Sequence, residues 1–272
     1  MGAQVYDSAA RAKPALHEFL QLFRYRDLIL ELISRSIKTR YKRSLLGVAW
    51  TMVSPLLSML VLTLVFSHLF RFQIEDYALY VLSGLLTWNF FAQSTTAALN
   101  DLIWSGGLIN RIYFPASVFS AAAIGTGLVN LALALVPYML ITLILGAELH
   151  STMLLLPIPV LGVGVFTLGV GLAVSSAAVR FQDVLPMYEV ILGAWMYLTP
   201  VFYPIDAVPP QLVFLFRWNP MFYYVDIFRS LVYLGEIPSK LSMLSGTGFA
   251  MLSFLLGWFL FNRKAREYAA YL

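Results

Sequence analysis

LLGVAWTMVSPLLSMLVLTLVFSHLF, residues 45 to 70, decides the fold class, because the stretch contains no Asp, Glu, Lys or Arg. A helix over these residues would be about 39 Å long at a rise of about 1.5 Å per residue. The hydrocarbon core of a bilayer is about 30 Å thick, so such a helix can cross it with some tilt. Pro55 lies inside the stretch and predicts a kink. Residues 45 to 70 are therefore predicted to be the first span of a membrane protein.

The composition of the whole chain supports the same class. Of the 272 residues, 60% are hydrophobic and 12% are charged, whereas soluble domains average about 45–50% and about 25%. The mean hydropathy is +0.78, and such an apolar chain needs lipid around most of its surface. Cysteine is absent, which excludes disulfides, thiol nucleophiles and cysteine-ligated metals.

Five further apolar runs follow the first one. They cover residues 77–100, 115–147, 149–179, 184–203 and 241–262, and each is long enough to supply a spanning helix. Of the 18 Lys and Arg residues, nine precede the first span, three follow the last, and Arg111 and Arg180 lie on the same predicted side. The positive-inside rule makes that side the cytoplasm. We expect an all-α, multi-pass membrane protein with six transmembrane helices and both termini in the cytoplasm.

The chain divides into a cytoplasmic N-terminal segment, residues 1–43, and a transmembrane domain, residues 44–272. Between Leu16 and Tyr41, apolar residues recur at helical spacing along one face, and basic residues close the segment. This pattern predicts an amphipathic helix that lies in the cytoplasmic membrane interface. The alternative is a simple basic anchor for the first span.

Residues 199–233 form an apolar and aromatic stretch that is interrupted by prolines. Its apolar segments of about 10–14 residues are too short to span a bilayer and indicate short re-entrant helices between spans five and six. Such helices would line or close a pore. The alternative is a loop that lies on the outer leaflet.

Four glycines in the fourth run, Gly162, Gly164, Gly169 and Gly171, form two pairs with a spacing of seven residues. That spacing places them on one helix face and predicts close helix packing rather than a nucleotide-binding loop.

The sequence offers no catalytic constellation. His17, His68 and His150 fall on different sides of the predicted membrane, so they cannot share a metal, and no Walker A loop is present to bind ATP phosphates. Spans one to four carry ionisable residues only near their ends, which argues against coupling to protons or sodium ions. We expect no enzymatic activity, no metal and no cofactor in this chain, and no nucleic-acid partner.

Aromatic residues make up 15% of the chain and form clusters. Neutral aromatic rings stack on the apolar C–H faces of sugars, so a conduit lined by them would let a glycan slide. The residues considered for that role are Trp88, Phe90, Phe91, Trp195, Tyr197, Phe202 and Tyr203. Membrane interfaces also enrich Trp and Tyr, and for any single residue such an interfacial belt is the simpler explanation.

The cytoplasmic segment between spans two and three, from Asp101 to Phe114, combines a short amphipathic helix with a Gly-Gly break and is followed by Pro115. Such a segment can dock in a groove of a soluble partner. The alternative is an ordinary connecting loop.

Several short motifs occur in an order and spacing that are specific only when taken together. They are Lys38-Thr39-Arg40-Tyr41 before Leu45–Trp50 and Pro55, Leu82-Ser83-Gly84 before Trp88–Phe91, Asn110–Pro115, Arg180–Asp183, Thr199–Pro204 and Asn219–Met221. From about Leu28 onward, the chain resembles the membrane-spanning permeases of ABC-2 type exporters of lipid-linked polysaccharides, which handle O-antigen, capsule or teichoic acid.

The resemblance implies a homodimer in the bacterial cytoplasmic (inner) membrane that works with two copies of a separate ATP-binding subunit. That subunit, rather than this chain, would bind ATP and Mg²⁺. Spans one, two and five would line the path of the glycan, and the outer re-entrant helices would shape its exit. The residues implied to couple to the ATPase are Asp101, Leu102, Trp104, Asn110, Arg111, Tyr113 and Phe114.

The lipid pyrophosphate head group is expected to bind near the basic N-terminal region and the start of the first span. The residues assigned to it are Arg40, Tyr41, Lys42, Arg43 and Trp50. Binding of phosphates of the inner leaflet explains the three basic residues equally well.

We therefore expect a permease that exports a lipid-linked polysaccharide and is driven by a partner ATPase. An ABC-2 permease for a small molecule, such as a drug or haem, is the alternative. An intramembrane lipid-modifying enzyme is a third class, but the sequence lacks the clustered acid, base or metal ligands that such an enzyme needs.

Overall fold

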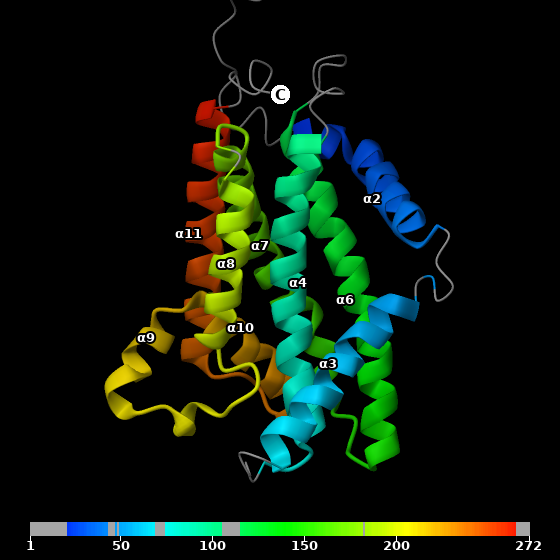
Figure 1. The fold of residues 1–272 in the computed structure, drawn as a ribbon, viewed down its shortest axis with the longest axis vertical. Helices are drawn as coiled ribbons and strands as arrows, with labels where there is room; N and C mark the ends of the chain where they lie inside the picture. The colour runs from blue at the N-terminus through cyan, green and yellow to red at the C-terminus, as the bar shows by residue number, and fades with distance from the viewer. Residues whose placement is uncertain are drawn as a thin grey trace, which may run out of the picture.

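The computed structural model describes residues 21–42, 47, 49–68, 74–104, 115–181 and 183–264. Within these ranges every regular element is a helix, and the long helices form a bundle around α4 (Figure 1). The elements are α2 (Arg26–Tyr41), α3 (Ala49–His68), α4 (Tyr77–Trp104), α6 (Ser117–Leu145), η1 (Ser151–Leu155), α7 (Pro157–Ala178), α8 (Val184–Tyr197), η2 (Ile205–Ala207), η3 (Pro210–Leu212), α9 (Val213–Arg217), α10 (Pro220–Arg229), the π-helical η4 (Ser230–Leu234) and α11 (Lys240–Lys264).

Each of the six predicted apolar runs contains one long helix, and four of these helices are confirmed as candidate spans. By length and composition α3, α6, α7 and α11 can cross a membrane. The other two differ from the prediction for separate reasons. With 14 residues, α8 reaches only about 21 Å at about 1.5 Å per residue. α4 has 28 residues but contains no stretch as apolar as those in the four candidates.

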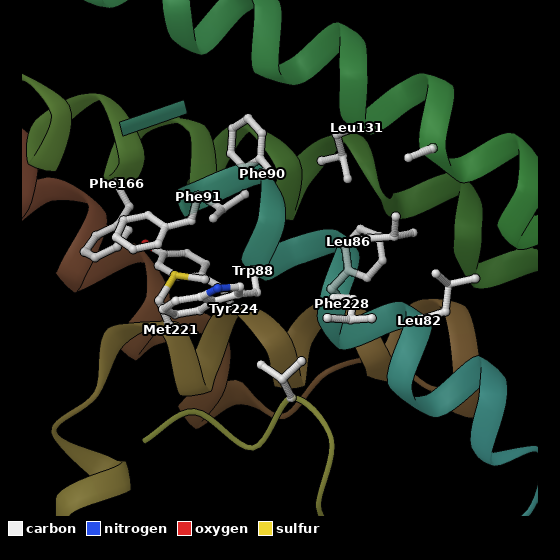
Figure 2. Close-up of a cluster of buried hydrophobic side chains, with 14 of the residues drawn as sticks. Leu82, Leu86, Trp88, Phe90, Phe91, Leu131, Phe166, Met221, Tyr224 and Phe228 are labelled. Atoms are coloured by element: carbon white, nitrogen blue, oxygen red, sulfur yellow. The ribbon is translucent and has the colours of Figure 1, made fainter. Parts of the chain in front are cut away.

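The lower hydropathy of α4 follows from its central position. Every residue from Val81 to Trp88 is buried, so this part of the helix faces protein on all sides and needs no lipid-facing surface. Figure 2 shows the aromatic centre of the core, where Phe91 lies beside Phe166 of α7. The centroid of the Phe91 ring is 5.5 Å from the ring centroid of Phe166 and 5.0 Å from that of Trp195 in α8. These distances are typical of packed aromatic pairs.

The predicted packing role of the glycines in residues 162–171 is confirmed at Gly169. A Cβ at this position would overlap the backbone of Ser253 in α11, and a Cβ at Gly257 would overlap the carbonyl of Gly169. The backbones of α7 and α11 therefore touch at this crossing. At Gly162 and Gly164, by contrast, a Cβ would make only ordinary contacts.

The proline-rich stretch after α8 folds into five short helical elements rather than one span. Asn219 organises the turn: its Oδ1 accepts hydrogen bonds from Trp195 Nε1 at 2.7 Å and from the backbone N–H of Met221 at 3.0 Å. Its Nδ2 donates to Thr199 Oγ1 at 2.9 Å. Because Pro220 occupies the first turn of α10 and Asn219 caps it, the helix begins at this point.

Candidate functional site

A polar cavity of about 240 Å³ lies between α2, α3, α4 and α6. In Figure 1, α4 lies in the middle of the bundle, and α2, α3 and α6 lie to its right. The lining is Ser36, Arg40, Trp50, Thr51, Ser54, Pro55, Leu86, Asn89, Phe90, Gln93, Ser94, Ala97, Asp101, Ala123, Thr126, Gly127, Asn130, Leu131 and Ala134. A cavity with so many hydroxyl and amide groups inside an apolar bundle is the strongest candidate for a functional site.

Helical spacing explains why the polar groups meet. Asn89, Gln93 and Asp101 are four or eight residues apart on α4, so they form one polar stripe along the helix. Thr126 and Asn130 of α6 are likewise four residues apart and line the opposite wall. The cavity is thus built from two matched stripes on neighbouring helices.

Two polar atoms of this cavity lack a hydrogen-bond partner within the part of the chain that the structure describes. They are Ser94 Oγ and Asn130 Oδ1, and both are buried. A buried unsatisfied polar group costs about 1–3 kcal/mol, so water or a hydroxyl-rich ligand in the cavity would stabilise both groups.

The predicted head-group residues are partly brought together here. Arg40 and Trp50 both line the cavity, and the positive charge of Arg40 acts on the carboxylate of Asp101. Lys42 is exposed and does not line the cavity. The side chain of Tyr41 and all of Arg43 lie outside the described residues.

The predicted ATPase-coupling residues have different environments. Asp101 lines the cavity. Leu102 is fully buried in a small core with Phe119 of α6 and Trp258 of α11, whereas Trp104 at the end of α4 is 85% exposed. The remaining four, Asn110, Arg111, Tyr113 and Phe114, lie outside the described residues.

The predicted channel aromatics do not form one surface. Trp88, Phe91 and Phe202 are buried in the core of a single chain. Phe90 is also buried but lines the cavity, and Trp195 and Tyr203 are half-buried. Tyr197 is 69% exposed. Within one chain these residues pack in the core or at its edge, and their assignment to a channel wall stays a prediction.

The sequence analysis missed a buried arginine, Arg229 of α10. Its Nη1 donates to Tyr80 Oη at 2.9 Å, and its Nη2 donates to the carbonyls of Pro200 and Val201 at 3.1 and 3.0 Å. The guanidinium lies 3.6 Å from the centroid of the Tyr80 ring, a cation–π contact. Gly84 permits this arrangement, because a Cβ there would come within 2.7 Å of the Val201 carbonyl oxygen.

The cavity amides were missed as well. Asn89 and Gln93 are one helical turn apart in an otherwise apolar run, and this spacing was a signal that sequence inspection could have used. No such local signal exists for Arg229, because its partners are 28 to 149 residues away in the chain.

Comparison with known proteins supports the family resemblance over most of the chain. A family model for the ABC-2 type transporter matches residues 27–233. The chain is 27% identical over 254 residues to the O-antigen export system permease protein RfbA of Myxococcus xanthus, which covers 92% of this chain and 96% of the relative. It is also 27% identical to the protein of that name from Klebsiella pneumoniae, over 89% of this chain and 94% of the relative. The polysialic acid transport protein KpsM of Escherichia coli is 22% identical over 86% of this chain and 92% of its own length. Because the family model covers well over half of the residues, the chain belongs to the ABC-2 type transporter family.

Proposed function

We propose that this chain is the transmembrane permease subunit of an ATP-driven exporter that moves a lipid-linked polysaccharide of the O-antigen type across the cytoplasmic membrane. The observation that carries the proposal is the cavity between α2, α3, α4 and α6, whose amide and hydroxyl groups suit a neutral, hydroxyl-rich substrate. The similarity to O-antigen and polysialic acid permeases over nearly the full chain supports it.

The energy for export comes from a separate ATP-binding subunit in this proposal. The family pairs a permease with such a subunit, and we propose two copies of it, bound to a homodimer of this chain. The exposed Trp104 at the end of α4 is suited to contact the ATPase, together with the segment that follows it. Leu102 would act only by holding the end of α4 in place, because its side chain is fully buried.

The proposed membrane arrangement completes the sequence-based prediction. All six long helices cross the bilayer, with α4 enclosed by protein and α8 extended by the turn after it. The elements between α8 and α11 dip into the membrane from the outer side, α2 lies in the cytoplasmic interface, and both termini are cytoplasmic. The basic residues near the first span support this orientation.

The head group of the lipid would reach the cavity between the end of α2 and the start of α3. Arg40 and Trp50 come from these two helices and line the cavity together. A guanidinium attracts the phosphates of the lipid, and an indole ring suits the boundary between water and lipid.

A complementation experiment tests the proposal. The gene is deleted in its native bacterium, and surface polysaccharide and lipid-linked glycan retained in the cell are quantified. We expect surface polysaccharide to be lost and lipid-linked glycan to accumulate. The wild-type gene restores export, whereas Asn130→Leu, which replaces a cavity amide by an apolar side chain of similar size, restores much less.

Leu140→Ala is the matched control on the same helix, because Leu140 is exposed on the outer face of α6 and far along the helix from Asn130. Immunoblots of the membrane fraction verify equal amounts of both variants. Unchanged surface polysaccharide in the deletion strain would refute the proposal, and a changed sensitivity to drugs or haem instead would favour the small-molecule exporter.

A further inference from the structure

A second polar region lies at the end of the bundle where α11 begins and α9 projects (Figure 1). A hollow of about 590 Å³ separates η2, η3 and α9 from α10 and the start of α11. A smaller hollow of about 210 Å³ adjoins it, and the two share Ile205, Asp206, Phe222 and Asp226. Neither hollow has a lining residue in common with the cavity between α2, α3, α4 and α6.

The walls of these hollows present hydrogen-bond acceptors that lack donors. Asp226 Oδ2 accepts a hydrogen bond from Ser242 Oγ at 2.6 Å. No other donor from the described ranges of the chain reaches either carboxylate, which leaves Asp226 Oδ1 and both oxygens of Asp206 available. Asp206 is exposed and Asp226 is half-buried, so a ligand that fills the hollow and displaces water from these carboxylates is favoured if it donates hydrogen bonds.

Two arginines balance the charge of the two carboxylates. Arg217 lines the larger hollow and Arg229 the smaller one. Arg229 is only 9% exposed, and its Nε has no hydrogen-bond partner among the described residues. With two carboxylates and two guanidinium groups, the lining has no net charge, so it favours neither a simple cation nor an anion.

Aromatic and aliphatic side chains supply most of the rest of the lining. Phe216, Phe222 and Tyr223 border the larger hollow, and the rings of Phe222 and Tyr223 lie edge to face with centroids 5.2 Å apart. Phe222 is half-buried and offers an apolar surface to a ligand that has an apolar face of its own, whereas Phe216 and Tyr223 are buried behind the wall of the hollow. The hollow thus suits a neutral ligand that combines hydroxyl donors with a flat C–H face, and a pyranose ring has both.

We infer that this hollow is a binding subsite for a neutral sugar unit of the exported chain, with Asp206 and Asp226 accepting hydrogen bonds from its hydroxyls and the ring of Phe222 covering its C–H face. The inference rests on the proposed function and adds a second glycan contact, separate from the cavity that receives the substrate. A subsite at this end would hold each emerging unit and so oppose backward sliding of the polymer.

The absence of cysteine from the chain allows a direct test. Val208→Cys places a single thiol in the lining of the larger hollow. The permease is purified, reconstituted in lipid nanodiscs, and labelled with a water-soluble maleimide in the presence and absence of maltotriose, mannotriose or tri-N-acetylchitotriose. Because protection scales as one plus the ligand concentration over Kd, we expect labelling to slow about tenfold when a bound trisaccharide is present at about ten times its Kd.

Two controls accompany this measurement. Glu236→Cys carries its thiol on an exposed turn before α11 that lines neither hollow, and its labelling should not respond to sugar. Asp226→Asn, combined with Val208→Cys, keeps the side-chain shape but weakens an acceptor, and it should abolish the protection. Two further probes test for binding driven by charge. One is a trimer of sialic acid, which is an anion, and the other is Ca²⁺ without sugar.

The inference is overturned if none of the three neutral trisaccharides protects Val208→Cys, if Asp226→Asn leaves the protection intact, or if Ca²⁺ or the acidic trimer protects equally well. The outcome is distinct from that of the complementation experiment. Normal export by the wild-type chain without protection refutes only the subsite, whereas protection without any dependence of surface polysaccharide on the gene refutes the proposed function.

Discussion

Phe91 and Tyr197 resemble each other in the sequence as aromatic residues of a possible conduit, but the structure gives them opposite environments. Phe91 is fully buried between α7 and α8, whereas Tyr197 is 69% exposed at the end of α8. We predict that Phe91→Ala lowers the free energy of unfolding by about 3–5 kcal/mol, since it opens a cavity in a packed core. Tyr197→Ala should change it by less than about 0.5 kcal/mol.

Thermal unfolding of the purified chain, followed by tryptophan fluorescence in detergent, measures both effects. The same two variants are then compared for export. A lower midpoint temperature for Phe91→Ala alone agrees with a packing role. If the two variants are equally stable and Phe91→Ala nevertheless loses export, the result would support a role of Phe91 in the channel.

At the scale of the elements, the crossing of α7 and α11 depends on two glycines in backbone contact. We predict that Gly257→Ala destabilises the bundle by about 1–3 kcal/mol, the range typical of overpacking, because its Cβ would overlap the carbonyl of Gly169. Gly248→Ala on the same helix is the matched control. A Cβ there meets open space, so this variant should be neutral or more stable by up to about 1 kcal/mol from helix propensity. The midpoint temperatures of thermal unfolding, measured in the same detergent, compare the two variants. An equal loss of stability in Gly257→Ala and Gly248→Ala would exclude the packing explanation.

The long helices could be predicted from sequence because each is delimited by local signals. The third apolar run was expected at residues 115–147, and α6 covers Ser117–Leu145, with Gly146 in a left-handed conformation at its end. The proline-rich stretch could be predicted only in outline. Its geometry depends on contacts such as those of Asn219 with α8 and of Arg229 with α4, which join positions far apart in the chain.

The candidate site shows the same division between local and distant information. Charge and position indicated Arg40 and Trp50, and both line the cavity. The opposing wall, formed by Asn130 and its neighbours on α6, depends on how α4 and α6 pack. Neither the sequence of α4 nor that of α6 contains a feature that predicts this packing. Trp88 and Phe91 could not be recognised as core residues from an aromatic composition that suits a core, a belt and a conduit equally.

At the scale of the whole molecule, α3 is, among the four candidate spans, the one that the single chain leaves least covered. Only 6% of its spanning window is buried, against 50% for α7. Leu57, Leu60 and Leu64 are all more than half exposed and recur at intervals of three and four residues, so they form one apolar face. In the proposed homodimer this face meets its counterpart, and α3 lines the path between the two copies.

Single cysteines in the otherwise cysteine-free chain test this arrangement. We predict that oxidation of native membranes cross-links at least one of Leu57→Cys, Leu60→Cys and Leu64→Cys into a dimer, because a symmetric interface brings equivalent residues near its two-fold axis together. Met251→Cys and Leu255→Cys on α11 are equally exposed in the single chain and should stay monomeric, since lipid rather than a second copy covers that face. Cross-linking through α11 but not through α3 would indicate that the dimer interface is formed by α11 rather than by α3. The cavity between α2, α3, α4 and α6 would then open toward lipid instead of toward a second copy, and the glycan path would have to be sought within one chain.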